Sequence, residues 1–412
     1  MMRLIHDARL LVAIGLVCHA LGIASACSSE AGSDVGAGPD GSLDAGMDGA
    51  AGDGRPEAHT DGDEPDVLAD GPEERDADEA EGPSCEELRA VIGPSIEKAF
   101  PHMGSKDVAV GVRTDACESA TYFAGPSGLD ENMLFRIASV SKTYVAAAVL
   151  GLVSEGKLGL DETIEGYGFG LPNEDRITIR QLLNHTSGLY NYTSDPAFES
   201  GWTPEERLQS AASHDVHFEP GERWMYSNSN YVALGLIVLK ELGSDSFAEV
   251  VRARILAPLG LESTYFEPEE PFDESLAPGF GKTGASASPL VAWADGGMVA
   301  TLGDTTRWIQ TFASGDATPA LRDELLEGVP AAGGGVVSYG LGVMILSELA
   351  TGDVPAYGHT GDTPGFHSLA FWFPERGYTI AVVLNQDGGD PNVPMIAVAD
   401  ALNTVLPVRA AP

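Results

Sequence analysis

Hydrophobic and polar side chains alternate with two different periods along the chain, and each period predicts one kind of secondary structure. Residues 85–100 repeat apolar positions at helical spacing, which predicts an amphipathic helix, and residues 108–112 alternate as a strand does. From 137 to about 255 the apolar positions are mainly helical in period. This part of the chain therefore predicts one early strand followed by a large helical insertion.

Short β runs dominate the later part of the chain. Residues 341–386 include the runs 368–373 and 379–384, which are rich in the β-branched and aromatic residues that favour strands. Residues 394–406 then predict a closing helix, with Pro394 in its first turn. An early strand, a helical insertion, late antiparallel strands and a terminal helix together predict an α+β fold with an all-helical lobe.

The strongest helical pattern follows Ser139. Apolar side chains recur there at positions i, i+3, i+4, i+7 and i+8, which are Val145, Ala148, Val149, Leu152 and Val153. Ser139 and Lys142 lie three residues apart at the start of this helix, so the amine can reach the hydroxyl. Burial lowers the pKa of a lysine, and a neutral amine can accept the serine proton. The alternative, a surface serine beside an exposed lysine, fits poorly with a buried helix.

Two further motifs could complete a site with this pair. Tyr226-Ser227-Asn228 supplies a phenol that can carry a proton and an amide that can hold a carbonyl group. His359-Thr360-Gly361-Asp362 contains a glycine that lets a substrate lie close to a strand, whose N–H groups can bind an oxyanion. Taken alone, the first motif could be a helix-capping loop, and His359 could be a structural histidine.

Taken together and in this order, the motifs resemble the three signatures of the serine β-lactamase and penicillin-recognising enzyme family. Three further segments also look like that family's: Ile177–Leu189, Asp295–Met298 and Thr379–Asn385. The resemblance covers roughly residues 108–406. It implies a β-lactamase/transpeptidase-like fold, in which an antiparallel sheet is flanked by helices and the site lies between the sheet and a helical lobe.

The resemblance also implies acyl transfer. Ser139 would attack the substrate carbonyl, and Lys142 with Tyr226 would move the proton. The backbone N–H groups of Ser139 and Asp362 would stabilise the oxyanion. The substrate-binding residues that the resemblance implies are Asn228, His359, Thr360, Gly361 and Asp362.

The tyrosine in the second motif resembles class C β-lactamases, similar D-alanyl-D-alanine carboxypeptidases and related esterases. His359 stands where class C β-lactamases carry a lysine, so we expect a carboxypeptidase acting on peptidoglycan-type peptides. A β-lactamase or small-ester esterase, and a non-catalytic binding or signalling module, are the alternatives. Because both the nucleophile and the lysine are present, the enzyme is favoured. Lys282-Thr283-Gly284 matches the lysine version of the third motif, but it precedes Asp295 and is too early in the family's order.

Acidic residues set one segment apart. Residues 28–84 hold 18 of the 62 acidic residues and 2 of the 23 basic residues, with no Phe, Trp, Tyr or Ile. We therefore expect residues 27–84 to be a disordered, extended linker before a hydrolase domain at 85–412. The formal net charge of −39 argues against binding to nucleic acid, which needs clustered Lys and Arg.

Residues 1–26 resemble a bacterial lipoprotein signal. Arg3 and Arg9 precede an apolar run over 10–23, and small residues then lead to Cys27. The resemblance implies a lipid on Cys27 and predicts export to the cell envelope, either periplasmic or on the cell surface. We separately expect a monomer. The alternatives are an ordinary signal peptide and an uncleaved anchor, although the apolar run is shorter than the about 20 residues of a spanning helix.

The remaining cysteines and histidines do not predict a metal site. Export would place Cys85 and Cys117 in an oxidising compartment, so we expect a disulfide between them. His214 and His217 are two isolated histidines in a polar stretch of the sequence, and no H-E-x-x-H motif is present. The G-x-G-x-x-G matches that begin at residues 36 and 279 do not follow strands, so we expect neither a metal nor a nucleotide cofactor.

Overall fold

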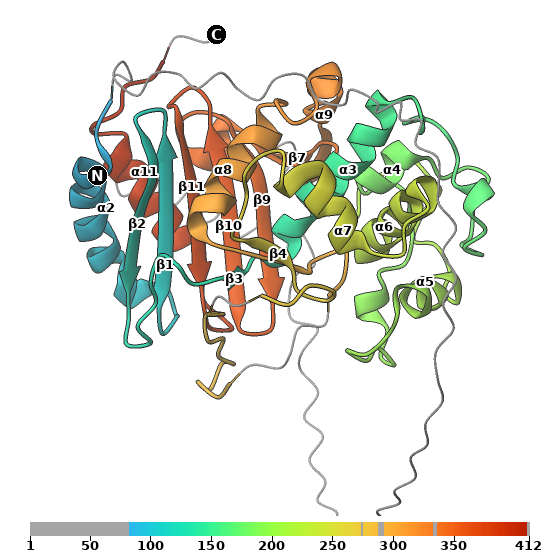
Figure 1. Ribbon diagram of the computed structural model, residues 1–412, viewed down its shortest axis with the longest axis horizontal. Helices are drawn as coiled ribbons and strands as arrows, with labels where there is room; N and C mark the ends of the chain where they lie inside the picture. The colour runs from blue at the N-terminus through green and yellow to red at the C-terminus, as the bar shows by residue number, and fades with distance from the viewer. Residues whose placement is uncertain (1–81, 273–274, 287–291, 333–335, 410–412) are drawn as a thin grey trace, which may run out of the picture. The chain divides into compact units, whose positions relative to one another are not determined.

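The structure, a computed structural model, describes residues 82–272, 275–286, 292–332 and 336–409 (Figure 1). The expected signal segment 1–26, lipidation at Cys27 and the linker up to residue 81 lie outside the described residues. In the described part of the chain, no helix is both long enough and apolar enough to cross a membrane. The first described helix is α2, Cys85–Ala99, whose first turn is fixed by a capping box between Ser84 and Glu87.

An antiparallel sheet of eight strands forms the centre of this domain, in the order β2-β1-β11-β10-β9-β8-β7-β6. The early strand β1 pairs along its whole length with the late strand β11, with Val108 opposite Leu384. The strands are β1 Val108–Thr114, β2 Cys117–Ala124, β6 Val329–Ala332, β7 Val337–Tyr339, β8 Met344–Leu346, β9 Ala356–Thr363, β10 Phe366–Phe373 and β11 Tyr378–Leu384.

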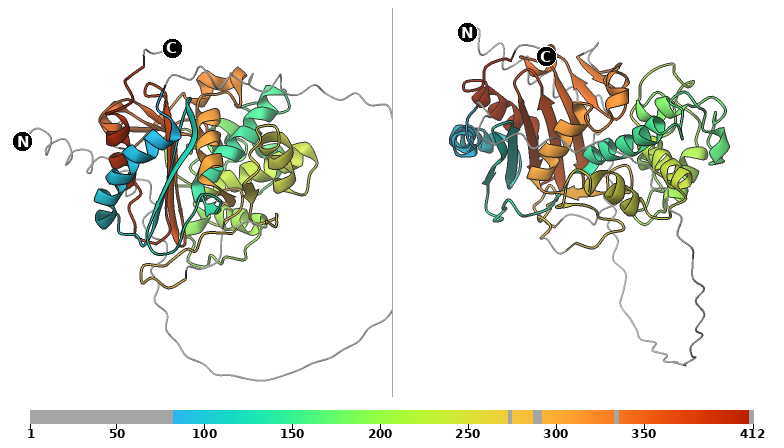
Figure 2. Two further views of the ribbon diagram at one scale, coloured as in Figure 1. Left: turned by 60° about the vertical axis from the view of Figure 1, so that its left-hand side comes forward. Right: turned by 45° about the horizontal axis from the view of Figure 1, so that its top comes forward.

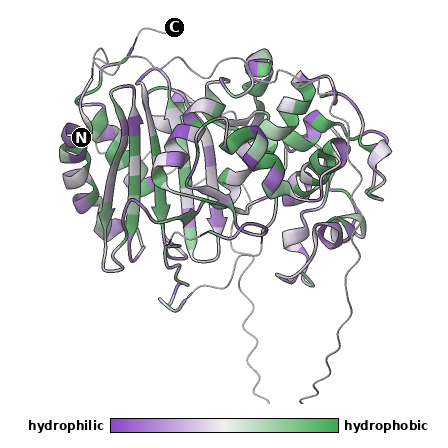
Figure 3. Cartoon of the chain, viewed as in Figure 1, coloured by the Kyte–Doolittle hydropathy of each residue, from purple (hydrophilic) through white to green (hydrophobic). Residues whose placement is uncertain are grey.

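Helices cover both faces of the sheet. Helices α2 and α11, Asn392–Leu402, pack on one face, and α8, Leu302–Ala313, packs on the other (Figure 2). Every residue of β11 is buried as a result. In Figure 3 the strands of the sheet show green stretches interrupted by white and purple residues. Strands buried on both faces can carry continuous apolar runs. The long apolar run over 379–384 has this physical cause.

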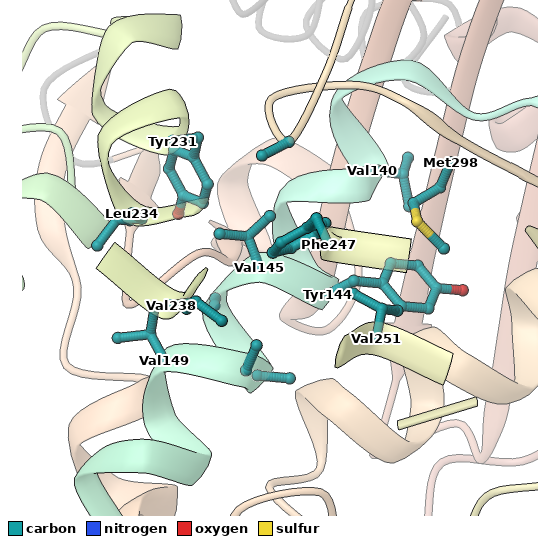
Figure 4. Close-up of a cluster of buried hydrophobic side chains, with 14 of the residues drawn as sticks. Val140, Tyr144, Val145, Val149, Tyr231, Leu234, Val238, Phe247, Val251 and Met298 are labelled. Carbon is teal, nitrogen blue, oxygen red and sulfur yellow. The ribbon is translucent and has the colours of Figure 1, made fainter. Parts of the chain in front are cut away.

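A helical lobe is inserted between β3 and the late strands. Helix α3 lies at its centre, and Val145 and Val149 of α3 lie close to Leu234 and Val238 of α6 (Figure 4). Burying one such side chain stabilises the fold by about 1.5–3 kcal/mol, so this packing fixes the start of α3. The lobe helices are α3 Lys142–Ser154, α4 Ile179–Leu183, α5 Pro204–Ala212, α6 Asn228–Leu242 and α7 Phe247–Val251.

Shorter elements connect these parts. A three-stranded sheet, in the order β3-β5-β4, carries the chain into the lobe and back. Its strands are β3 Phe135–Arg136, β4 Thr264–Phe266 and β5 Met298–Ala300. The remaining helical turns are η1 Phe100–His102, η2 Ala138–Ser141, η3 Glu165–Tyr167, η4 Tyr192–Ser194, η5 Arg252–Leu256, η6 Pro319–Leu321, α9 Arg322–Leu325 and α10 Glu348–Thr351.

The predicted α+β fold, of the β-lactamase/transpeptidase-like type, is confirmed. Several boundaries differ from the prediction; β1, for example, runs to Thr114 instead of ending at residue 112. Ser139 lies in the 3₁₀ turn η2, and the α-helix begins only at Lys142. The closing helix spans 392–402 instead of 394–406, because the residues after Leu402 turn away. A disulfide joins Cys85 at the start of α2 to Cys117 at the start of β2.

Candidate active site

Ser139 lies at the point where strand β3 turns into helix α3. The preceding residue, Ala138, has a φ of 50°, in the left-handed region that a residue with a side chain rarely adopts. The first backbone bond of η2 runs from the N–H of Val140 to the carbonyl of Ile137, so the N–H of Ser139 precedes the bonded turn. Ser139 itself is half-buried. Backbone strain at a half-buried serine is typical of an activated nucleophile.

Lys142 is completely buried, and its amine has three partners. The Nζ atom lies 3.0 Å from Ser139 Oγ, 2.8 Å from Asn228 Oδ1 and within hydrogen-bond distance of the Asp295 carbonyl oxygen. The amide and carbonyl oxygens can only accept hydrogen bonds. A neutral amine would give them its two N–H groups, which leaves its lone pair for the Ser139 hydroxyl. The geometry therefore suits Lys142 as the base that takes the serine proton.

The electrostatics of Lys142 agree with this role. Burial lowers the pKa of Lys142 to about 7, and the Asp295 carboxylate opposes that change. A base is most effective when its pKa lies near the working pH. The Nζ atom also lies 5.0 Å from the ring centre of Tyr226 and 5.5 Å from that of Tyr231.

Tyr226 places a free hydroxyl beside this pair. The residue is half-buried, and its hydroxyl oxygen is fully buried without a hydrogen-bond partner of normal geometry among the described residues. Burial raises the pKa of Tyr226 well above its usual range, and an interaction with the Ser139 hydroxyl opposes this rise. The His185 ring, 4.3 Å away between centres, supports the phenol from behind. An unpartnered buried hydroxyl is costly to a fold, so its retention indicates a role in chemistry.

Asn228 is held by the loop before α5. Its backbone N–H donates to Asn191 Oδ1 at 3.1 Å, and its Nδ2 donates to Thr193 Oγ1 at 3.4 Å. The second contact orients the amide so that Oδ1 faces Lys142. The predicted substrate-binding asparagine is thus also a partner of the base.

The third motif lies on β9, next to η2. Strand β8 pairs with β9 only at residues 356–358, so the described part of β8 leaves the edge of β9 beyond Gly358 without a strand partner. Gly361 crosses η2 so closely that a Cβ there would lie 2.3 Å from the carbonyl oxygen of Ile137. The structure therefore brings Ser139 and the strand before Asp362 together, as an oxyanion site requires.

The side chains of this motif have partners within the protein. His359 is buried, its Nε2 lies 2.8 Å from the hydroxyl of Tyr339, and its Nδ1 contacts the Thr360 carbonyl. Burial lowers the pKa of His359 to about 3, and the nearby Lys142 contributes to this change. Thr360 Oγ1 contacts Met344 Sδ. The His359 ring is therefore neutral, and both of its nitrogens are already engaged.

Asp362 is the most exposed part of the motif. Its side chain is 35% exposed, and its carboxylate lies 3.4 Å from Nδ1 of His367 on β10. Asp362 and Asp295 are the carboxylates that raise the pKa of Tyr226. A negative charge therefore lies at the edge of the site, on the strand that would bind the oxyanion.

Three further residues support the site, and the sequence motifs did not identify their roles. His185 accepts a hydrogen bond from the Ser227 N–H at 3.2 Å, and Asp295 supplies a carbonyl to Lys142. Both belong to segments that resemble the family, which was the available signal. Arg207 is buried and lies 3.5 Å from the Asp295 carboxylate. Helix α5 has the pattern of an ordinary amphipathic helix, so nothing in its sequence indicated a role for Arg207.

The other candidate residues lie elsewhere. The exposed side chain of Lys282 lies against Gly388. His214 stacks on Tyr190 at 3.9 Å between ring centres, and His217 lies 5.7 Å from the same ring. Within the described ranges, no group of three or more His, Cys, Asp or Glu residues could hold a metal ion.

Comparisons with known proteins show the family and the fold of the chain. The family model described as Beta-lactamase matches residues 101–403. Penicillin-binding protein 4* of Bacillus subtilis is 35% identical over 147 residues, which are 33% of this chain and 31% of that protein. The D-aminopeptidase of Brucella anthropi is 27% identical over 284 residues, covering 65% of this chain and 52% of that protein. Each of these matches spans less than two thirds of the relative's own length.

A solved structure matches over a larger share. The D-amino acid amidase from Ochrobactrum anthropi SV3, complexed with L-phenylalanine amide, is 27% identical with a TM-score of 0.69. The match covers 77% of this chain and 99% of that one. The match shows that the two chains share this fold.

Proposed function

This chain belongs to the beta-lactamase family of serine hydrolases, and we propose that it cleaves amide and peptide bonds next to D-amino acids through an acyl-enzyme at Ser139. One observation carries the proposal: Lys142 Nζ lies 3.0 Å from Ser139 Oγ and also contacts two acceptor oxygens, so a neutral amine that donates to those two oxygens has its lone pair left for Ser139. That arrangement suits proton removal from a nucleophile and has no evident use in a binding module.

The proposed reaction has two steps, acylation of Ser139 with release of the amine and then hydrolysis of the acyl-enzyme. Ser139 Oγ forms a bond to the substrate carbonyl carbon while its proton passes to Lys142, and the oxyanion is held by the N–H groups of Ser139 and Asp362. The amine of the leaving group then departs as it receives a proton, and the unpartnered hydroxyl of Tyr226 is placed to relay it. Water then cleaves the acyl-enzyme and restores Ser139.

The choice among substrates follows from charge. A D-alanyl-D-alanine carboxypeptidase, the activity expected from the sequence, must accept a carboxylate on its leaving group. His359 is neutral and engaged on both nitrogens, so its ring does not supply a cation for that carboxylate. A D-aminoacyl amide needs no such cation, and the D-aminopeptidase and D-amino acid amidase relatives support this class. Carboxypeptidase, β-lactamase and esterase activities are the alternatives, and each would use the same serine.

A panel of substrates tests the proposal. The full chain is incubated with D-phenylalanine amide, L-phenylalanine amide, an acyl-D-alanyl-D-alanine peptide, benzylpenicillin and p-nitrophenyl acetate. We expect turnover of the D-amide above the L-amide, with loss of all turnover in Ser139→Ala. Ser154→Ala is the matched control, because Ser154 lies at the far end of α3, the helix that follows Ser139, and its hydroxyl donates to the Leu150 carbonyl. Turnover of the carboxyl-terminated peptide in preference to the D-amide would overturn the substrate assignment.

We also infer that the protein is an exported monomer anchored by a lipid on Cys27. The charged start, the short apolar run and the small residues before Cys27 support this location, as does the disulfide between Cys85 and Cys117, which forms in oxidising compartments. Membrane fractionation of the full chain and of Cys27→Ser tests the anchor. Release of Cys27→Ser into the soluble fraction is expected, and retention of both proteins on the membrane would contradict it.

A further inference from the structure

We propose that Arg207 is a positioning residue for Lys142: it holds the Asp295 carboxylate, fixes the Asp295 carbonyl against the lysine amine and balances the negative charge behind that amine. The inference rests on the proposed acylation of Ser139 and concerns a residue that does not touch the substrate. Arg207 lies on α5 and Asp295 lies before β5, so the contact joins the lobe to the small sheet.

The Asp295 carboxylate is fully engaged behind the site. One oxygen accepts a hydrogen bond from the Tyr192 hydroxyl at 2.7 Å, and the other accepts from the Trp293 N–H at 3.1 Å. Arg207 lies 3.5 Å from the second oxygen and also donates to the Tyr192 hydroxyl at 3.2 Å. The carboxylate and the carbonyl belong to one residue, so holding the carboxylate holds the carbonyl that contacts Lys142.

The same loop holds both acceptors of the lysine amine. Tyr192 lies between Asn191 and Thr193, the two residues that hold Asn228. The Tyr192 N–H also donates to Ser229 Oγ on α6 at 3.0 Å. Displacement of Tyr192 would therefore disturb the Asp295 and Asn228 contacts together. Arg207 fixes this tyrosine through a direct hydrogen bond and through its position 5.3 Å from the ring centre.

The charges of Arg207 and Asp295 affect whether Lys142 is protonated. Arg207 and Asp295 are each only 5% exposed, so water screens their charges poorly. The Asp295 carboxylate favours the protonated form of Lys142. Arg207 opposes that effect, since it places a permanent positive charge beside the carboxylate. Without Arg207, the uncompensated carboxylate would keep Lys142 protonated to higher pH, and a protonated amine cannot accept the serine proton.

Several other groups face the Lys142 amine and could affect its protonation. Three hydroxyl groups come from η2, from the loop before α6 and from α6 itself. Two imidazole rings come from the segment after α4 and from β9. Both imidazoles are buried and have lowered pKa values, so they carry no charge near neutral pH. The groups that face the amine are Ser139, Tyr226, Tyr231, Asn228, His185, His359 and Asp295.

The test is the pH profile of acylation by p-nitrophenyl acetate, a probe that does not depend on the natural substrate. The full chain is measured as kcat/KM from pH 5 to pH 10 for wild type, Arg207→Met, Arg207→Lys and Asp295→Asn. We expect the acidic limb of Arg207→Met to move up by about one pH unit, with about tenfold lower kcat/KM at pH 6 and a smaller change on the alkaline plateau. The limb of Asp295→Asn should move down, and Arg207→Lys should stay near wild type.

Two controls keep a structural effect distinct from a positioning effect. Arg180→Met removes an arginine that bonds to Asp161 at 2.8 Å elsewhere in the lobe, and its acidic limb should match wild type. Arg207→Met/Asp295→Asn removes both buried charges, which proteins often tolerate better than one unpaired charge. The double variant should regain the wild-type limb.

The outcomes separate this proposal from the proposed function. If wild type releases no p-nitrophenol and acquires no acetyl group on Ser139, the proposed function fails. If wild type is acylated but the folded variants all keep its acidic limb, the Arg207 proposal is wrong. If neither single variant folds while the double variant folds with the wild-type limb, the pair is structural, and the proposal is also overturned. Opposite shifts in Arg207→Met and Asp295→Asn support it.

Discussion

The hydroxyl of Tyr339 lies 2.8 Å from Nε2 of His359, and the Thr360 carbonyl accepts from Nδ1 of the same ring. A carbonyl only accepts hydrogen bonds, so Nδ1 carries the proton and Nε2 accepts from the tyrosine. Burial lowers the pKa of His359 to about 3, which keeps this tautomer neutral. The third motif therefore offers its backbone and a small residue, Gly361, to a substrate.

His359→Gln tests this interpretation. A neutral histidine does not attract a substrate carboxylate, so we expect the variant to lower turnover of an acyl-D-alanyl-D-alanine peptide and of the matching acyl-D-alanyl methyl ester by the same factor. Loss of the buried hydrogen bond between His359 and the Tyr339 hydroxyl should also lower the free energy of unfolding by about 1 kcal/mol. A selective loss for the carboxylate-bearing peptide would show that His359 binds a carboxylate after all.

The pKa of Lys142, lowered to about 7, predicts the pH dependence of acylation. The neutral amine is the active form, so kcat/KM should be fully present well above pH 7 and should fall as the pH drops through the pKa. Below pH 6 the fall should approach tenfold for each pH unit. The measurement is the rate of p-nitrophenol release across the pH range. Lys142→Arg, which stays protonated, should lose about 10²–10⁴-fold at every pH, and a limb centred near pH 4.5 would assign the base to a carboxylate instead.

Tyr226→Phe separates catalysis from stability. The Tyr226 hydroxyl has no partner among the described residues, so its removal breaks no hydrogen bond of the fold. We expect the melting temperature to stay the same or rise slightly, while kcat/KM for amides falls by about 10²-fold because proton transfer is impaired. Tyr231→Phe is the matched control: its hydroxyl donates to the Leu183 carbonyl at 2.8 Å, so that change should cost about 1 kcal/mol of stability. Equal activity losses in both variants would deny Tyr226 a special role.

The sequence predicted those parts of the site that are local in the chain. Ser139 and Lys142 share one helical turn, and the second and third motifs are short, so all three could be recognised in the sequence. Each motif alone is a weak signal, and the three together and in this order indicated the site through their resemblance to a known family. The apolar run of β11 was visible because both faces of the sheet are covered. Strands of two or three residues, such as β3 and β5, carry too few positions to show a period.

Contacts between distant segments were beyond the reach of pattern analysis. Arg207 and Asp295 are separated by 88 positions, and no feature of α5 distinguishes a buried arginine from an exposed one. The Tyr339 contact of His359 likewise depends on β7 and β9 being packed in one sheet, two strands apart. Residue types indicated a neutral lysine beside the serine, but only the packing shows how its charge is balanced.

The Cys85–Cys117 disulfide should stabilise the domain without serving the reaction. It closes a separation of 32 residues between α2 and β2, and constraining the unfolded chain over such a loop stabilises the fold by about 4 kcal/mol. We expect Cys85→Ala/Cys117→Ala to lower the melting temperature while keeping the wild-type rate of acylation at 25 °C, because α2 covers the sheet face opposite α8. Treatment of wild type with a reductant is the parallel test. A large change in rate with an unchanged melting temperature would contradict this division.

Gly361→Ala should impair acylation more than it impairs folding. A Cβ at this position would lie 2.3 Å from the Ile137 carbonyl oxygen and 2.3 Å from Ser368 Oγ, two atoms that are themselves hydrogen-bonded at 2.8 Å. The methyl group must therefore push β9 away from η2, which separates the Asp362 N–H from Ser139. A displacement of about 1 Å at a reacting centre can cost about 10²-fold in rate. We expect a loss of that size in the rate of acetylation of Ser139.

The matched control for this variant is Gly166→Ala, where nothing lies within 4 Å of the added Cβ. Its acetylation rate and melting temperature should stay close to wild type. Circular dichroism melting of both variants separates a local displacement from general unfolding. The added methyl group acts by separating β9 from η2, so an acetylation rate within twofold of wild type in Gly361→Ala would mean that the oxyanion is bound elsewhere.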